Sequence, residues 1–296
     1  MEKSSGVSHV SVYKIISLIV LIILGFLFLF PLYWIVTGAF KPAADVLSTT
    51  PIWFPREWVL DNFAKLFSMR SAPLFEIGSL TGPTVPGAIR WLVNTVFMAV
   101  AALLLTCITA SMAGYALAKK RFIGRGVLFG LVICAMALPK QVILIPLIRE
   151  MSTLSMYDTI WAVILPTVGW PFGVFLMRQF SEGIPGEMLE AAKIDGASEA
   201  RIFTQIVFPM IRPGVGALAI FTFINSWNDY FLQLIMLTSN SNLTISLGIA
   251  TMQAENSTDY GLIMAGATLA AIPIIAIFIA FQKYFTQGIT MGAVKG

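Results

Sequence analysis

Histidine, cysteine and charged residues are scarce in this sequence. Its 296 residues include one histidine, His9, and two cysteines, Cys107 and Cys134, and only 11% of all residues are charged. An intramembrane metalloenzyme or histidine-dependent protease would need histidine in its apolar segments, whereas His9 lies in the N-terminal tail. Both cysteines lie within apolar runs, so the sequence does not indicate a disulfide framework.

The dipeptide Gly-Lys is also missing, and with it the phosphate-binding loop G-x-x-x-x-G-K-S/T of common nucleotide hydrolases. Together these absences argue against an enzyme. We therefore expect no catalytic residue, no metal site and no cofactor in this chain. The classes that remain are a channel, a transporter subunit and an assembly scaffold for other membrane proteins.

Apolar residues are abundant instead, at 57% of the chain with a mean hydropathy of +0.84. A soluble domain of this length would be far less apolar. The hydrocarbon core of a bilayer is crossed by about 20 helical residues. Stretches of that length predict six spans, at 15–38, 91–118, 127–148, 157–180, 213–238 and 261–281. Because lipid offers no partner to free backbone groups, we expect an all-α integral membrane protein with six transmembrane helices, the first being an uncleaved signal anchor.

The distribution of basic residues predicts how these spans are oriented. The segment KKRFIGR at 119–125 is strongly basic, whereas the loop 239–260 contains two acids and no base. Positive charge is retained on the cytoplasmic side, so both termini are expected there. The predicted order is a tail 1–14, a first helix 15–40, an extracytoplasmic loop 41–90, a core 91–281 with a cytoplasmic loop 182–212, and a tail 282–296. The net charge of +4 then suits anionic membrane lipid, and nucleic acid is not expected as a partner.

The cytoplasmic loop contains the densest charge of the chain, in EAAKIDGASEARIFTQIVFP at 190–209. Pro185 suits the first residue of a short helix, Gly196 suits its left-handed end, and Ser198 suits the cap of a second helix that runs to Pro209. A helix of about ten residues is only about 15 Å long and cannot cross a bilayer. It could rest on lipid headgroups, but lysine is not enriched on its polar face and its paired alanines permit close approach. These features favour docking to another protein.

Polar residues in the fifth predicted span suggest a pathway for a solute. The candidate pathway residues are Thr222, Asn225, Ser226, Asn228, Asp229, Tyr230 and Gln233. Asp229 is the only acid well inside a predicted span, and such residues usually serve a function. Hydrogen bonding between helices explains the stripe equally well. Prolines and glycines interrupt the third and fourth predicted spans, as is typical of helices that line a cavity; these are Pro139, Pro146, Pro166, Gly169, Pro171 and Gly173.

At this point the residues resemble a known family. Glu190-Ala191-Ala192, followed by Gly196 and Pro209, resembles the E-A-A loop of binding-protein-dependent ABC importer permeases, with Phe208 where the family usually has leucine. Further stretches are similar to sugar-importer permeases of the MalG type: YALAKKRFIGR at 115–125, LPTVGWPFGVFLMRQF at 165–180, NSWNDYFLQLIML at 225–237 and the terminal GITMGAVKG.

The resemblance implies a type I ABC importer permease fold in a bacterial cytoplasmic membrane. It implies a coupling helix seated on a separate ATPase, with the contact residues Glu190, Ala191, Ala192, Asp195, Gly196 and Pro209. The implied partners are a second, MalF-type permease subunit, two ABC ATPase subunits that bind ATP and Mg²⁺, and an extracytoplasmic solute-binding protein. The implied cargo is a sugar or oligosaccharide. An ATP-independent channel or transporter is the alternative, although it has no need of the stretch 190–209.

The extracytoplasmic loop is too long for a simple connection. Its part 51–67 interleaves aromatic and charged residues and predicts a short helix at the membrane interface. Residues 68–88 are rich in Gly, Pro and Ser and should project outward. We expect them to form, with 239–260, this subunit's share of the dock for the binding protein.

Overall fold

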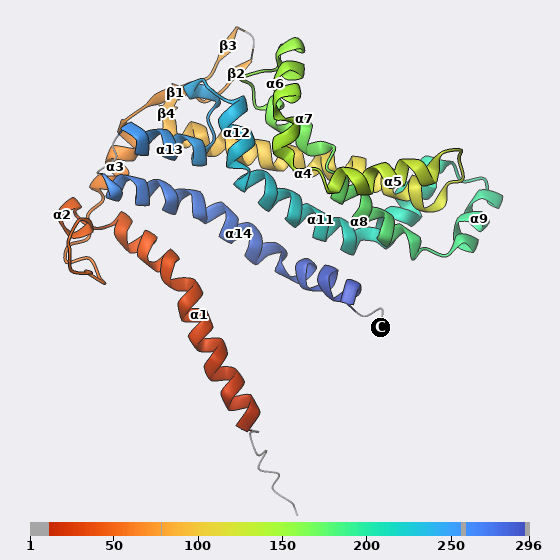
Figure 1. Ribbon diagram of the computed structural model, residues 1–296, viewed down its shortest axis with the longest axis horizontal. Coiled ribbons are helices and arrows are strands. Elements are labelled where there is room, and N and C mark those ends of the chain that lie inside the picture. The colour runs from red at the N-terminus through yellow and green to blue at the C-terminus, as the bar shows by residue number, and fades with distance from the viewer. Residues whose placement is uncertain (1–11, 78, 256–258, 294–296) are drawn as a thin grey trace, which may run out of the picture.

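The computed structural model describes residues 12–77, 79–255 and 259–293, and within these ranges it is an elongated bundle of helices with one small β-hairpin (Figure 1). The elements in chain order are α1 (Val12–Ala39), α2 (Ala43–Val46), α3 (Asp61–Ser68), β1 (Ser71–Pro73), β2 (Glu76–Ile77), β3 (Leu80–Thr81), β4 (Thr84–Pro86), α4 (Gly87–Lys119), α5 (Arg125–Met136), the 3₁₀ turn η1 (Lys140–Ile143), α6 (Leu144–Thr153), α7 (Trp161–Val168), α8 (Pro171–Glu182), α9 (Gly186–Ile194), α10 (Glu199–Ile202), the π turn η2 (Phe203–Val207), α11 (Phe208–Asn228), α12 (Tyr230–Met236), the 3₁₀ turn η3 (Asn240–Asn242), α13 (Ile245–Glu255) and α14 (Tyr260–Ala293).

Five helices of the described chain are long and apolar enough to cross a membrane, and a sixth span results if the bent pair 125–136 and 140–153 is counted as one. The helices predicted at 91–118 and 261–281 are confirmed as parts of α4 and α14, and α14 continues beyond the predicted span. The helix predicted at 15–38 is confirmed as part of α1, which splays away from the bundle in Figure 1 and is exposed along its most apolar stretch. Such an exposed apolar helix is what lipid or another membrane subunit covers.

The centre of the bundle is α4, which packs against α8, α11 and α7. Its crossing with α8 is very close. A Cβ added to Gly114 would lie 2.6 Å from the backbone of Met177 and Arg178. Small residues permit this approach of two helices, as is common in membrane bundles.

The third predicted span, 127–148, is wrong as a continuous helix. The chain bends by 102° between α5 and the segment η1–α6. Pro139 explains the bend, because proline offers no N–H to the preceding turn and forces the residue before it out of the helical conformation. The fourth predicted span is also divided: α7 ends at Val168, and α8 begins at Pro171.

The fifth predicted span, 213–238, is misplaced. The helix begins at Glu199, passes through η2 and continues to Asn228 without a gap, so that α10, η2 and α11 form one 30-residue span. Pro213 lies inside this helix and does not begin it. The span ends at Asp229, where the backbone leaves the helical conformation before α12 starts.

The segment 239–260, expected to be a loop, contains the short apolar helix α13. Its residues Ile245, Leu247 and Met252 are buried in the same core as Trp91. The turn η3 before it is bound to the start of α4, because the Asn94 amide donates to the carbonyls of Ser241 at 2.7 Å and Leu243 at 2.9 Å.

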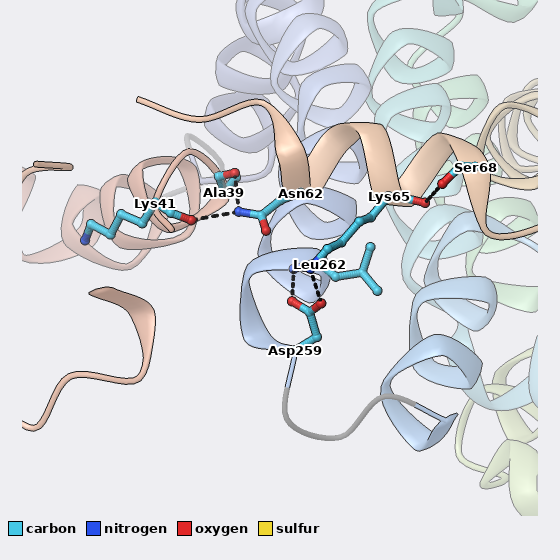
Figure 2. A network of polar contacts seen from close by, with 7 residues as sticks. All are labelled: Ala39, Lys41, Asn62, Lys65, Ser68, Asp259 and Leu262. Atoms are coloured by element: carbon cyan, nitrogen blue, oxygen red, sulfur yellow. Dashed lines mark hydrogen bonds and ion pairs between the residues drawn. The ribbon is translucent and has the colours of Figure 1, made fainter. Parts of the chain in front are cut away.

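A polar network at the same end of the bundle joins α1, α3 and α14 (Figure 2). The Asn62 amide donates to the carbonyls of Ala39 and Lys41, each at 2.9 Å, and thereby satisfies the end of α1. Lys65 pairs with Asp259 at 3.0 Å, and Asp259 also accepts a hydrogen bond from the Leu262 amide at the start of α14. The helix predicted within 51–67 is thus present in its last part, as α3.

Residues 71–86 form an antiparallel β-hairpin that projects from the bundle (Figure 1), with β1 paired to β4 and β2 paired to β3. We call this end of the molecule the hairpin end and the opposite end, which contains α9, the α9 end.

Candidate functional site

The loop at the α9 end has the two short helices expected from its sequence. Helix α9 covers Gly186–Ile194 and α10 begins after Ser198, whose hydroxyl accepts a hydrogen bond from the Arg201 amide at 3.3 Å. Gly196 between them has φ +78°, which confirms its left-handed conformation. Pro185 is not the first helical residue, as predicted, but the residue before it. Its ψ of 130° is extended, and the helix begins at Gly186. We call residues 185–202 the coupling loop.

Two lysines at the end of α4 hold the coupling loop in place. Lys119 donates to the carbonyls of Glu182 at 3.0 Å and Ile184 at 2.6 Å, where α8 ends. Lys120 pairs with Glu199 on α10. The basic segment 119–125, from which we predicted the orientation of the spans, therefore also holds this loop in place.

An apolar contact anchors the inner face of α9. Leu189 is buried in a cluster with Ile184, Ile202 and Val207, and Ala192 packs at its edge. The opposite face is open, with Glu190, Ala191 and Asp195 all exposed. Pro209 is exposed in the first turn of α11, outside the coupling loop proper.

Apolar side chains also stand on the open face of the coupling loop. Ile194 is 87% exposed and Met188 is 43% exposed. A short, rigid loop with exposed apolar and acidic side chains has the composition of a protein-docking surface.

A second candidate site lies at the interruptions of the three broken spans. A cavity of about 490 Å³ is lined by residues from the η1 bend, from the gap between α7 and α8, and from the end of α11. Polar groups reach it from each of these places: Lys140 and Gln141, Thr167, and Asn225 with Asp229. The volume falls in the range of small-molecule sites, about 300–1,000 Å³. We call this space the central cavity.

An ion pair joins two of the breaks inside the central cavity. Lys140 lies 3.0 Å from Asp229, measured from Nζ to Oδ2. The other oxygen of Asp229 accepts from the Leu232 amide at 3.4 Å, so Asp229 is the cap of α12. The aromatic side of the cavity is supplied by Trp170 and Phe172, whose ring centroids are 4.9 Å apart.

The structure separates the seven predicted pathway residues into three groups. Only Asn225 and Asp229 line the central cavity. Three others are buried: Thr222, Ser226 and Gln233. Gln233 has a structural contact, since its amide donates to the Ser226 carbonyl at 3.0 Å across the break and accepts from Thr244.

Asn228 and Tyr230 form the third group. Both are exposed and lie outside the cavity lining. Trp227, which flanks them, is buried and stacks on Phe223 with centroids 5.4 Å apart.

Sequence reasoning missed Lys140, Gln141 and Trp170 as cavity residues. A signal for Lys140 was present, because it is the only charged residue in the apolar run 127–148 and directly follows Pro139. Charge beside a helix-breaking proline in an apolar segment is typical of cavity linings.

One element connects the two sites. The continuous helix 199–228 begins in the coupling loop and ends at the central cavity, and 30 residues correspond to about 45 Å. The two sites therefore lie at opposite ends of one helix, with Asn225 in its last turn and Asp229 directly after it.

Known proteins are similar to this chain over most of its length. Residues 106–291 match the family described as "Binding-protein-dependent transport system inner membrane component". The arabinooligosaccharide transport system permease AraQ of Halalkalibacterium halodurans is 35% identical over 92% of this chain and 93% of its own length, and AraQ of Bacillus subtilis is 33% identical over 97% of each.

A solved structure has the same fold. It is a chain of a bacterial ABC transporter involved in the import of the acidic polysaccharide alginate, with a TM-score of 0.75 and 20% identity over 92% of this chain and 96% of that one. The chain described here belongs to the family of inner-membrane permease components of binding-protein-dependent transport systems.

Proposed function

We propose that this chain is the MalG-type subunit of an ATP-driven importer that moves a sugar or oligosaccharide inward across the bacterial cytoplasmic membrane. Two permeases similar in sequence to this chain are named for arabinooligosaccharide transport, which supports an oligosaccharide as the cargo. The chain works with a MalF-type permease subunit and with two ATPase subunits that bind ATP and Mg²⁺. In this arrangement the α9 end and both termini face the cytoplasm, and the hairpin end faces outward.

The observation that carries the proposal is the open face of the coupling loop. Ile194 and Met188 expose apolar surface beside Glu190, while Lys119 and Lys120 hold the loop rigid from behind. A flexible loop would absorb a push, whereas this one passes it into α4 and α11. Energy from ATP hydrolysis enters the permease through this contact, with Glu190 offering a charge-assisted hydrogen bond to a basic group of the ATPase.

The transport step follows from the connection of the two sites. When the ATPase subunits close, the coupling loop moves with them and the helix 199–228 moves as one rod. Its far end carries Asn225 and Asp229, so the central cavity changes shape as the pathway alternates between the two membrane faces. The binding protein docks at the hairpin end, on residues 71–86 and the neighbouring turn η3.

The proposal is tested at Ile194. Ile194→Ser removes the most exposed apolar group of α9 without touching the buried Leu189 face. We expect the purified complex to lose ATPase subunits and the remaining complex to transport less sugar per ATP. Ile123→Ser is the matched control, because Ile123 is fully exposed in the α4–α5 connection, also at the α9 end, but outside the coupling loop. Equal ATPase retention and transport in the two variants would contradict the docking assignment.

An ATP-independent channel or transporter is the competing function. The broken spans and the central cavity would serve it equally well, but it has no use for a rigid loop with exposed apolar groups. Removal of ATP distinguishes the two, since a channel continues to conduct sugar down its gradient.

A further inference from the structure

The charges of the central cavity compensate each other. Among the residues that line it, Lys140 is the one cation and Asp229 the one anion, and they form a pair at 3.0 Å. The side chain of Lys140 is 56% exposed, and that of Asp229 only 15%. Asp229 is thus mostly buried in the wall, while Lys140 is the more exposed partner of the pair.

The charge of Asp229 is not needed for its role as the cap of α12. Asp229 caps α12 through a hydrogen bond from the Leu232 amide, and asparagine caps helices about as well as aspartate. An ionised group in a membrane segment is costly and usually serves a function. The function of this carboxylate is therefore to be sought in its effect on Lys140 and on the cavity.

The other lining groups suit a hydroxylated ring. Trp170 and Phe172 give the cavity an aromatic wall, and Asn225 and Gln141 add amide donors and acceptors. The Asn225 amide makes no side-chain hydrogen bond within the described part of the chain. A mostly apolar pocket with a few polar groups that are free to bind is the usual form of a small-molecule site.

We propose that the central cavity is a sugar subsite of this subunit, and that Asp229 makes it selective for neutral sugars over uronic acids. The inference rests on the proposed import of a carbohydrate. A neutral hydroxyl can accept a hydrogen bond from a remaining N–H of Lys140 while the pair with Asp229 stays intact, because an ammonium group has three donors. A uronate carboxylate meets the same free donors, but the ammonium charge is already neutralised by Asp229, and the Asp229 carboxylate repels it.

The test compares two trisaccharides that differ only in oxidation at C6, galactotriose and trigalacturonate. Their binding to the full-length chain in lipid nanodiscs is measured by saturation-transfer NMR. The wild-type chain should bind galactotriose and bind trigalacturonate far more weakly. Asp229→Asn leaves Lys140 without its partner, so trigalacturonate affinity should rise about tenfold or more, as expected for a hydrogen bond between charged groups. Galactotriose affinity should change by less than about threefold, since no neutral contact is lost.

Two further variants keep the test decisive. Lys140→Gln combined with Asp229→Asn removes both charges and should abolish the gain for trigalacturonate. Trp170→Ala should weaken galactotriose binding if the sugar lies against the aromatic wall. The proposal is overturned if Asp229→Asn leaves trigalacturonate binding unchanged, if the double variant gains it equally, or if neither sugar binds in a manner sensitive to Trp170. These readouts need no ATPase, so they can fail while ATP-dependent uptake by the complete wild-type transporter still upholds the proposed function.

Discussion

Gly196 is the residue of the coupling loop whose replacement has the most predictable cost. Its φ is +78°, and nothing lies within 4 Å of the position that a Cβ would occupy. Gly196→Ala therefore causes no clash, and its cost comes only from the left-handed backbone, about 1–2 kcal/mol for an L-residue. This lowers the population of the correct turn relative to alternatives by a factor of about 5–30.

Gly186 is a matched control in the same loop. It also has free space around its Cβ position, but it is the first residue of α9, where the backbone is helical. Gly186→Ala should be neutral or stabilise by about 0.5–1 kcal/mol. Gly196→Asn should destabilise the turn less than Gly196→Ala, because asparagine tolerates the left-handed region. Gly196→Val should destabilise the turn most, because its side chain is β-branched.

The assay is the ratio of sugar transported to ATP hydrolysed by the reconstituted transporter. We expect the ratio to fall in the order Gly186→Ala, Gly196→Asn, Gly196→Ala, Gly196→Val, with the first equal to wild type. Equal ratios for Gly196→Ala and Gly186→Ala would contradict a role for the left-handed turn, because the two positions differ in backbone conformation and both have free space around the added Cβ.

Three other predictions concern stability and docking. Gly114→Ala should destabilise the chain by about 1–3 kcal/mol through overpacking against the α8 backbone, and Gly130→Ala, with open space around it, should not; thermal unfolding in detergent compares them. Burial raises the pKa of Asp158, but hydrogen bonds from Ser239 and Thr238 outweigh this and lower it. The stability that Asp158 contributes is therefore fully present above 3.8, the pKa of this group in the unfolded chain, and is lost as the pH falls through the lower pKa of the folded chain. Asp158→Asn should lower the melting temperature at pH 7, and this difference between variant and wild type should disappear in strong acid. Shortening the hairpin by removing 76–81 keeps the β1–β4 pairing and should weaken stimulation of ATP hydrolysis by the binding protein while basal hydrolysis stays intact; full stimulation would show that the hairpin tip has another use.

Features of the fold that depend on local sequence could be predicted. Helices α1, α4 and α14 follow from apolar runs that exceed the membrane thickness, because no other structure satisfies their backbone in lipid. Gly196 and Ser198 were predictable because a left-handed turn and a helix cap each depend on one residue type.

Features that depend on tertiary contacts were missed. The sequence predicts Asp229 as part of one polar stripe on a continuous helix. In the structure Asp229 caps α12 at a break between two helices, and hydropathy does not reveal such a break. Helix α13 is too short for a span, and its burial against α4 depends on hydrogen bonds from Asn94 to residues about 150 positions away. The pair of Lys140 and Asp229 arises only when two breaks in different spans meet, and no local pattern encodes that meeting.

In the proposed function, this permease moves sugar only when a docked ATPase hydrolyses ATP. The most direct measurement is uptake of a radiolabelled arabinooligosaccharide by proteoliposomes that contain this chain, its partner permease and the ATPase subunits, with the binding protein outside and ATP inside. We expect accumulation against a gradient that requires ATP, binding protein and an intact Ile194 contact. Equal uptake without ATP, or by the chain without ATPase subunits, would contradict it.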